Sequence, residues 1–267
     1  MTTRMTTLVK PPLLAARDLA VSIAGKPIVQ QWYFALHAGE RLAILGRNGV
    51  GKSTLLHTLA GLHAADAGDI ELAGDRYATL GPRCAARLRG LLPQHQADAF
   101  AASVLDSVLI GRHPYLSRWD WESAADEELA HAALTAVGLA DLAARSLHTL
   151  SGGERQRVAL ATLLVQQPKV YLLDEPLAHL DLNHQIGMLS LMSQRVQVEQ
   201  AAAVMVLHDV NLAARFSDKT LLLYGAGEYE FGDSEVMLNA ERLSRLYDYP
   251  LRVIESDNRA WFIPKIT

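Results

Sequence analysis

The sequence predicts an α/β protein that has a mostly parallel sheet, an antiparallel β part near the N-terminus and an inserted helical subdomain. A buried strand, a glycine-rich turn and the start of a helix follow one another between residues 42 and 56. Three short apolar runs begin at Val170, Val204 and Leu221, and each is continuous, as expected for parallel strands covered on both faces. In residues 97–162 Ala and Leu dominate and strand patterns disappear, which indicates helices.

The antiparallel part is predicted from two strands that precede the glycine-rich turn. They cover Leu14–Ile23 and 28–36 and are joined by a turn at Gly25-Lys26-Pro27. The residues before them, which end at Pro11-Pro12, are predicted to form a loose tail. A short strand with Ile70 and Leu72 is predicted to end at Gly74, and another short strand ends near Leu92. The other predicted elements are a stop of the first helix at Gly61, a helix over 184–198, and a terminal hairpin of 251–254 and 261–263 around Asp257-Asn258.

The glycine-rich turn fits the phosphate-binding pattern G-x-x-x-x-G-K-[ST], the P-loop. Its three glycines are expected to take positive φ angles that bring backbone N–H groups close to an anion, and the following helix points its positive dipole end there. The lysine can reach the β- and γ-phosphates of a nucleotide, and the next hydroxyl can bind Mg²⁺. An ordinary strand-to-helix turn would explain the glycines but not the lysine and serine in register. The predicted nucleotide-binding residues are Gly46, Arg47, Asn48, Gly49, Val50, Gly51, Lys52, Ser53 and Thr54.

Composition limits the possible function classes. Half of the 267 residues are hydrophobic, enough for a substantial core, and the net charge of 25 − 29 = −4 gives no overall basic footprint for nucleic acid. Cys84 is the only cysteine, so no internal disulfide can form, which fits a reducing compartment. No apolar run approaches the roughly 18 residues of a spanning helix, and Arg17 and Asp18 interrupt the N-terminal apolar stretch. We therefore expect a soluble cytoplasmic protein without a signal peptide, which reaches a membrane only through a partner.

A pair of carboxylates, Asp174-Glu175, ends the apolar run that begins at Val170. At that place Asp174 can hold Mg²⁺, directly or through water, and Glu175 can act as the general base that polarises an attacking water. The alternative is a solvated acidic pair at a strand end. The apolar run before the pair and Pro176 after it favour the functional interpretation.

A second anion site is predicted at a helix that starts after Leu150. Ser151 and Glu154 have the spacing of a capping box, and Gly152 and Gly153 leave the helix N-terminus open. Because a free helix N-terminus attracts anions, this one is accessible to a phosphate from outside the subunit.

The order of these motifs resembles the ATP-binding subunits of ABC transporters over about residues 14–247. The run Leu150-Ser151-Gly152-Gly153-Glu154-Arg155-Gln156 is similar to that family's signature, and with the P-loop and the carboxylate pair it is very specific. The resemblance implies that Gln94 is the lid glutamine, which senses Mg²⁺ and the membrane partner, and that His208 is the switch histidine at the γ-phosphate. Leu180-Asp181 matches the loop that communicates across the family's dimer.

The resemblance also implies a domain organisation and a mechanism. The chain is then a single ABC ATPase domain over 1–267, in which 13–96 and 163–267 form the P-loop ATPase core and 97–162 form the helical signature subdomain. Two copies form a head-to-tail homodimer that encloses ATP and Mg²⁺, and a coupling helix of the membrane partner docks near the lid glutamine. The implied catalytic residues are Glu175, His208, Gln94 and Lys52, the implied Mg²⁺ residues are Ser53, Gln94 and Asp174, and the implied ATP contacts from the second subunit are Ser151, Gly152 and Gly153.

The sequence indicates a group of possible transported substrates but not a single one. Gly111-Arg112-His113-Pro114-Tyr115 resembles a Gly-Arg-x-Pro stretch of importers for iron chelates, haem and cobalamin, and 246–264 is similar to the same group. A plain helix-breaking loop is the alternative for the first stretch. The resemblance implies an integral membrane permease, indirectly a periplasmic or surface substrate-binding protein, and a peripheral position on the cytoplasmic face of the inner or plasma membrane.

Three other functions stay open at this point. The chain could be the ATPase of another transporter class, or a soluble, transporter-independent ABC ATPase of translation or repair. Such soluble relatives usually carry two cassettes or a long coiled-coil insertion, and the sequence has neither. A non-hydrolysing adaptor is the third alternative, and the presence of Glu175 argues against it.

One position departs from the family pattern. Members usually have an aromatic residue upstream of the P-loop that stacks on adenine, and the matching position here is Ile23. We therefore expect Ile23 to cover the base by apolar contact alone. Trp32 or Tyr33 could supply the stacking instead, although their place in a predicted strand favours core packing.

Overall fold

The computed structural model describes residues 11–94, 102–256 and 259–266. Three sequence predictions therefore fall wholly or partly outside the described residues. They are the tail before Pro11, the start of the helical region at 97–101, and the hairpin turn at Asp257 and Asn258.

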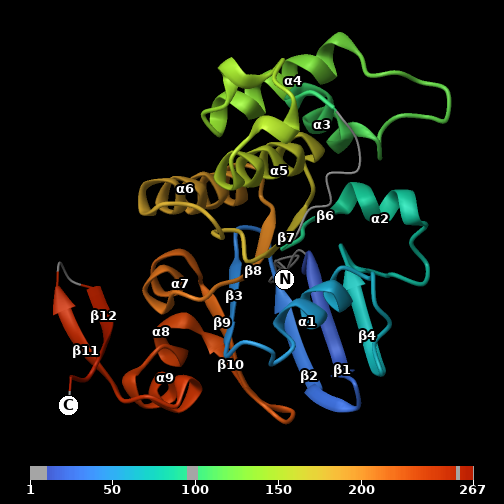
Figure 1. Cartoon of the computed structure of the whole chain (residues 1–267). Coiled ribbons are helices and arrows are strands. Elements are labelled where there is room, and N and C mark those ends of the chain that lie inside the picture. The colour runs from blue at the N-terminus through green and yellow to red at the C-terminus, as the bar shows by residue number, and fades with distance from the viewer. Residues whose placement is uncertain (1–10, 95–101, 257–258, 267) are drawn as a thin grey trace, which may run out of the picture.

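A six-stranded sheet forms the centre of the molecule, in the order β10-β9-β3-β8-β7-β6 (Figure 1). Its neighbouring strands are parallel except for β10 and β9, which are antiparallel. The predicted, mostly parallel sheet is thus confirmed, whereas β10 was not predicted. The strands are β3 (Arg41–Gly46), β6 (Arg89–Leu92), β7 (Val170–Asp174), β8 (Ala202–Val206), β9 (Lys219–Gly225) and β10 (Glu228–Asp233).

A second sheet, in the order β2-β1-β4-β5, is antiparallel throughout and confirms the predicted antiparallel part. The predicted terminal hairpin is also present, as a separate sheet made of β11 and β12. The strands are β1 (Leu14–Ile23), β2 (Lys26–Leu36), β4 (Ala67–Leu72), β5 (Asp75–Arg76), β11 (Leu251–Ser256) and β12 (Arg259–Pro264).

Helices α3, α4 and α5 form a group of their own at the top of Figure 1, where α5 packs against the other two. They supply the predicted helical region, and α5 continues past residue 162.

Helices α2, α7, α8 and α9 were not predicted, because elements of eight residues or fewer give little periodicity. Within the described ranges, no helix combines the length and the apolar character needed to cross a membrane. The helices are α1 (Lys52–Leu59), α2 (Pro82–Leu88), α3 (Val104–Leu109), α4 (Ala124–Ala136), α5 (Gly152–Gln166), α6 (Leu182–Val198), α7 (Val210–Phe216), α8 (Ser234–Met237) and α9 (Ala240–Tyr247), with short 3₁₀ turns at Ile110–Arg112, Ala140–Leu142 and Leu147–Thr149.

Two layers of buried side chains cover the two faces of the central sheet. Along β3, Ala43 and Leu45 belong to the layer that contains α3, α4, α5 and α6, while Leu42 and Ile44 belong to the layer that contains α1, β1 and β2. Since both faces are covered, the strands need no polar alternation, and this explains their continuous apolar runs.

The loop that follows α3 is held tightly against α5. A Cβ atom on Gly111 would collide with the carbonyl oxygen of Thr162, so the close approach of the two backbones requires glycine. The neighbouring Arg112 donates to Asp126 Oδ1 at 2.7 Å and to the carbonyl oxygen of Val165 at 3.1 Å, and both charged side chains are largely buried. The Gly-Arg pair therefore joins α3, α4 and α5.

Gly111→Ala is expected to lower the free energy of unfolding by about 1–3 kcal/mol, the usual cost of added volume in a packed site. The clash is with a backbone oxygen, which has no rotamer with which to give way. Gly187→Ala in α6 is the matched control, since a Cβ atom there meets nothing within 4 Å. In a helix that change stabilises by roughly 0.5–1 kcal/mol. Urea unfolding measures both variants, and equal unfolding free energies would contradict the steric role of Gly111.

Candidate functional site

The predicted site residues follow the carboxyl ends of neighbouring parallel strands. The P-loop follows β3, Glu175 follows β7, His208 comes after β8 and Gln94 after β6. In the sheet these strands are consecutive, in the order β3-β8-β7-β6. Because the carboxyl ends of parallel strands lie at one edge of a sheet, residues far apart in sequence meet there, where α/β proteins bind their ligands.

The P-loop glycines meet the sequence expectation only in part. Gly49 and Gly51 have positive φ angles of 77° and 104°, as expected. Gly46 does not lie in the left-handed region, so the expectation is wrong for this residue. Glycine is required at this position for a steric reason instead, since a Cβ atom there would lie 2.8 Å from the carbonyl oxygen of Leu223 in β9.

Lys52 is only 5% exposed, and its ammonium group lies inside the P-loop. It donates to the carbonyl oxygens of Gly46 at 2.9 Å and Arg47 at 3.1 Å. Burial lowers the pKa of Lys52, and the carboxylates of Glu175 and Asp174 act in the opposite direction. Because phosphate oxygens are stronger acceptors than carbonyls, this ammonium group is placed to bind a phosphate held by the loop.

Ser53 and Asp174 bring two oxygen ligands together beside the P-loop. Ser53 Oγ donates to Asp174 Oδ1 at 2.9 Å and so connects α1 to the end of β7. Asp174 is 1% exposed; burial raises its pKa, and the hydrogen bond from Ser53 lowers it. Hydroxyl and carboxylate oxygens are the ligands that Mg²⁺ prefers, so this pair fits the cation.

His57 belongs to the same site and was missed by the sequence predictions. Its Nε2 lies 3.8 Å from Asp174 Oδ2. This nitrogen is buried and has no hydrogen-bond partner within the part of the chain that the structure describes. The available signal was its spacing from Ser53, because residues four apart lie on the same face of a helix.

Glu175 contacts both the residue that the resemblance gives as the lid glutamine and the one that it gives as the switch histidine. Gln94 Nε2 donates to Glu175 Oε2 at 2.8 Å, and His208 Nε2 lies 2.9 Å from Glu175 Oε1. The backbone of Glu175 has a φ of 49°, in a region that residues other than glycine rarely adopt. The ends of β6, β7 and β8 thus converge on a carboxylate of the kind that acts as a general base.

The helix that carries the signature run begins with the predicted capping box. Ser151 Oγ accepts from the Glu154 N–H at 3.3 Å, and Glu154 Oε2 accepts from the Ser151 N–H at 2.7 Å. These hydrogen bonds lower the pKa of Glu154. The capping box is therefore confirmed, and it leaves the backbone at Gly152 and Gly153 uncovered by any side chain of its own.

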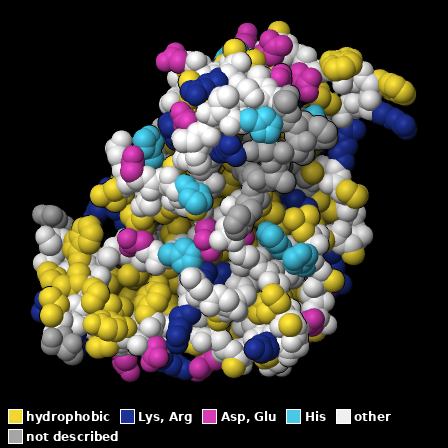
Figure 2. Space-filling model, viewed as in Figure 1, with side chains coloured by type: hydrophobic (Ala, Val, Ile, Leu, Met, Phe, Trp, Pro, Cys, Tyr) yellow, Lys and Arg dark blue, Asp and Glu magenta, His cyan; other side chains and the backbone are white. Residues whose placement is uncertain are grey.

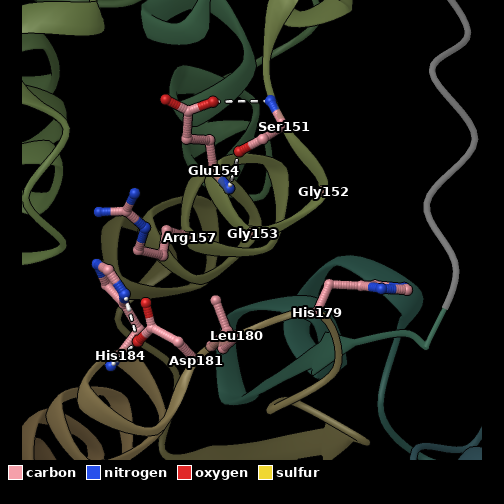
Figure 3. A pocket seen from close by; sticks show the side chains of 9 residues that line it. All are labelled: Ser151, Gly152, Gly153, Glu154, Arg157, His179, Leu180, Asp181 and His184. Carbon is pink, nitrogen blue, oxygen red and sulfur yellow. Dashed lines mark hydrogen bonds and ion pairs between the residues drawn. The ribbon is translucent and has the colours of Figure 1, made fainter.

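A pocket of about 380 Å³ opens at this helix N-terminus (Figure 3). On its other side lie the loop before α6 and the first turn of that helix, where His184 Nδ1 is 2.8 Å from the N-cap Asp181 Oδ1. Among the described residues, no P-loop residue lines this pocket and no hydrogen bond connects Ser151 to the P-loop. One chain therefore keeps its two predicted anion sites apart. The pocket is lined by Ser151, Gly152, Gly153, Glu154, Arg157, His179, Leu180, Asp181 and His184.

The residues considered as contacts of the adenine base differ in exposure. Ile23 ends β1 and is 45% exposed. Trp32 is buried and stacks on Phe34 with 4.3 Å between ring centroids, so core packing is confirmed for it. The prediction of core packing is wrong for Tyr33, because this residue is exposed. Successive side chains of a strand point to opposite faces, and only one face of this sheet is buried at that position.

The fold and the site define a P-loop protein that binds a nucleoside triphosphate. A family model described as ABC transporter matches residues 29–178, more than half of the sequence. The chain belongs to the ABC transporter family, and it is an ATP-binding ATPase coupled to transport.

Individual relatives agree with this assignment. The hemin import ATP-binding protein HmuV of Deinococcus radiodurans is 39% identical over 249 residues, which cover 91% of this chain and 93% of that protein. The petrobactin import ATP-binding protein FpuD of Bacillus anthracis is 37% identical over 235 residues, 87% and 85% of the two chains. A solved metal-chelate type ABC transporter in an inward-facing conformation superimposes with a TM-score of 0.82 at 32% identity and covers 95% of this chain and 98% of that chain.

Proposed function

We propose that this chain is the ATP-hydrolysing subunit of an importer for an iron chelate, haem or cobalamin, powered through a partner membrane permease. The observation that carries the proposal is the convergence of Gln94, Glu175 and His208 beside the P-loop. Two of the relatives are named as import proteins for hemin and petrobactin, which supports this group of substrates.

The site residues that were predicted from the sequence have separate roles in this proposal. The P-loop backbone and Lys52 bind the triphosphate, and Glu175 polarises the water that attacks it. Ser53, Asp174 and Gln94 hold Mg²⁺, which when bound neutralises phosphate charge. His208 contacts the γ-phosphate from the end of β8.

The active unit in this proposal is a homodimer. Ser151, Gly152 and Gly153 lie away from the P-loop of their own chain and present an open helix N-terminus, which suits a phosphate held by another copy. Each ATP is then enclosed by the P-loop of one subunit and the signature helix of the other. Binding of ATP closes the dimer, and hydrolysis with product release opens it.

The remaining parts of the proposal concern partners and location. The chain lies peripherally on the cytoplasmic face of the inner or plasma membrane and indirectly serves a periplasmic or surface substrate-binding protein. It forms one ATPase domain, in which 97–162 is the helical subdomain inserted between 13–96 and 163–267. A coupling helix of the permease docks between the core and the helical part, near Gln94.

Co-purification tests this function against the soluble alternative. The chain, expressed with a candidate permease from the same genome, is expected to be recovered in a membrane complex whose ATPase activity rises when substrate-loaded binding protein is added. A chain that stays in the soluble fraction and hydrolyses ATP equally well with and without the permease would support the transporter-independent ATPase instead.

Ile23→Tyr is expected to lower KM for ATP, by on the order of tenfold, with little change in kcat. An aromatic face stacked on a base contributes on the order of 1–3 kcal/mol in single-stranded nucleic-acid sites. Ile23 has no aromatic face, so ATP and GTP are expected to be discriminated poorly by the unmodified protein. The base lies far from the bond that breaks, which leaves kcat largely unaffected.

Nucleotide KM values for the unmodified protein and the variant measure this effect. Ile254→Tyr is the matched control, because Ile254 is 42% exposed on the terminal hairpin. Strong ATP preference in the unmodified protein, unchanged in Ile23→Tyr, would show that another residue holds the base.

A further inference from the structure

The loop before α4 exposes two large aromatic side chains that the ATPase site does not use. Trp119 and Trp121 are 84% and 86% exposed, the highest values among the described tryptophans. The loop projects beyond the outline of the molecule in Figure 1, and Figure 2 shows hydrophobic and basic side chains together on this projection, at the upper right. Large apolar groups exposed together with little burial often mark an interaction site.

The exposed loop is fixed to the folded part of the chain by hydrogen bonds to α2. Arg83 and Arg87 of α2 donate to the carbonyl oxygen of Pro114 at 3.0 Å and 2.8 Å, and Arg83 also donates to the carbonyl oxygen of Leu116. The guanidinium group of Arg87 lies 5.2 Å from the centroid of the Tyr115 ring. The base of the loop is therefore braced, and its end is held away from the core.

A turn at the end of the loop directs the carboxylate of Asp120, which lies between the two tryptophans in the sequence, back toward Ser117. Asp120 Oδ2 accepts from the Ser117 N–H at 3.0 Å, and the Asp120 N–H donates to the Ser117 carbonyl oxygen at 3.2 Å. The hydrogen bonds from Ser117 lower the pKa of Asp120. The carboxylate is thus turned toward the loop's own backbone, while both neighbouring indoles point to solvent.

Three arginines and two carboxylates lie around the indoles. Of the carboxylates, Asp120 stands between the two tryptophans in the sequence, and Glu122 follows Trp121 and lies 3.8 Å from His113 Nε2. Arg83, Arg87 and Arg118 are exposed, and no carboxylate of the described residues lies within salt-bridge distance of any of them. The guanidinium group of Arg118 lies 5.6 Å from the centroid of the Trp119 ring. These indoles and exposed guanidinium groups, which form no salt bridge within the described residues, are called the tryptophan loop below. It comprises Arg83, Arg87, Arg118, Trp119 and Trp121.

We propose that the tryptophan loop inserts its two indoles into the headgroup region of an anionic lipid bilayer. Indoles prefer the boundary between water and hydrocarbon, because the ring is apolar and its N–H is polar. Exposed arginines beside them are attracted to anionic headgroups. A projecting loop with separated aromatic ends suits a soft lipid surface better than a rigid protein surface, which would need a matching pocket for each ring.

The position of the loop agrees with a membrane contact. It is braced on α2, which leads directly into β6 and then to Gln94. Gln94 borders the proposed docking place of the permease, and the proposal places the loop against the bilayer around that permease. For this orientation the inference rests on the proposed function, whereas the lipid contact itself is testable without a permease.

Sedimentation with vesicles tests the proposal on the purified full chain. The unmodified protein is expected to bind vesicles that contain phosphatidylglycerol, and to bind phosphatidylcholine vesicles much less. Trp119→Ala combined with Trp121→Ala is expected to abolish the binding, and Arg118→Glu to reduce it by a factor of about five or more, since one arginine near an anionic surface contributes about that factor. Raising the salt concentration is expected to weaken the binding, as it screens surface charge.

Two matched variants serve as controls. Trp261 is 43% exposed on the terminal hairpin, and Arg252 is exposed on the same hairpin, so Trp261→Ala and Arg252→Glu are expected to bind vesicles like the unmodified protein. ATP hydrolysis of the isolated Trp119/Trp121 double variant is expected to be unchanged, which shows that it is folded.

Two outcomes would overturn the lipid contact. The first is an unmodified protein that does not bind phosphatidylglycerol vesicles, or a double variant that binds them equally well. The second is a double variant that no longer co-purifies with the permease from detergent, where no bilayer is present, because the loop would then bind protein. Failure of the unmodified chain to associate with any permease would contradict the proposed function. The vesicle experiment would still test the lipid contact, because it contains no permease.

Discussion

Glu175→Gln is expected to lower ATP hydrolysis by about 10²–10⁴-fold, the usual contribution of a general base, while ATP binding persists. The amide keeps the size of the side chain but cannot take a proton from water. The change leaves the P-loop and Lys52 in place, and these are the residues proposed to bind the phosphates. Turnover of the purified variant and a nucleotide-binding measurement separate the two effects.

Because hydrolysis is blocked after ATP has bound, Glu175→Gln is also expected to accumulate as an ATP-bound dimer in size-exclusion chromatography. Glu128→Gln is the matched control, since Glu128 is exposed on α4, away from the site. Near-normal turnover of Glu175→Gln would remove Glu175 from the catalytic role and leave Gln94 and His208 without a shared target.

Ser151→Arg is expected to reduce hydrolysis by about 10²-fold or more, although Ser151 contacts no P-loop residue of its own chain among those described. That size is typical for the loss of one preorganised donor at a developing charge. A large cation at the helix N-terminus occupies the place where the phosphate of the neighbouring subunit would bind. ATP binding to the isolated P-loop is expected to remain, so the defect is in turnover.

Ser123→Arg is a closely matched control for this variant. Ser123 forms the same capping box with Asp126 at the start of α4 as Ser151 forms with Glu154 at the start of α5. Both variants lose a helix cap, which costs about 1 kcal/mol of stability. Only the Ser151 variant is expected to lose hydrolysis, and equal losses in both would show that the effect is structural.

Cross-linking provides the direct measurement of the shared site. In a Cys84→Ser background, Ser151→Cys of one subunit is expected to form a disulfide with Asn48→Cys in the P-loop of the other, and ATP is expected to increase the yield. Asn48 is exposed in the single chain, so it is accessible to the partner. Full ATPase activity from a protein that stays monomeric with ATP would refute the shared site.

Local motifs could be predicted from the sequence, because neighbours along the chain fix their geometry. The P-loop turn needs only residues 46–53 and the helix behind it, and both Gly49 and Gly51 have the expected positive φ. The capping box needs only Ser151 and Glu154, and both of its hydrogen bonds are present. The continuous apolar runs of β7, β8 and β9 likewise indicated strands buried on both faces.

Contacts between distant segments were decided by the tertiary structure. Gly46 is required because Leu223 of β9 passes beside it, and no pattern near Gly46 contains that neighbour. His57 lies near Asp174 because α1 packs close to the end of β7. The loop that carries the exposed Trp119 and Trp121 is held at Pro114 by hydrogen bonds from α2, which lies far from it in the sequence. A one-dimensional pattern records which side chains share a face of an element, whereas the order of strands and the packing of helices select which other side chains they meet.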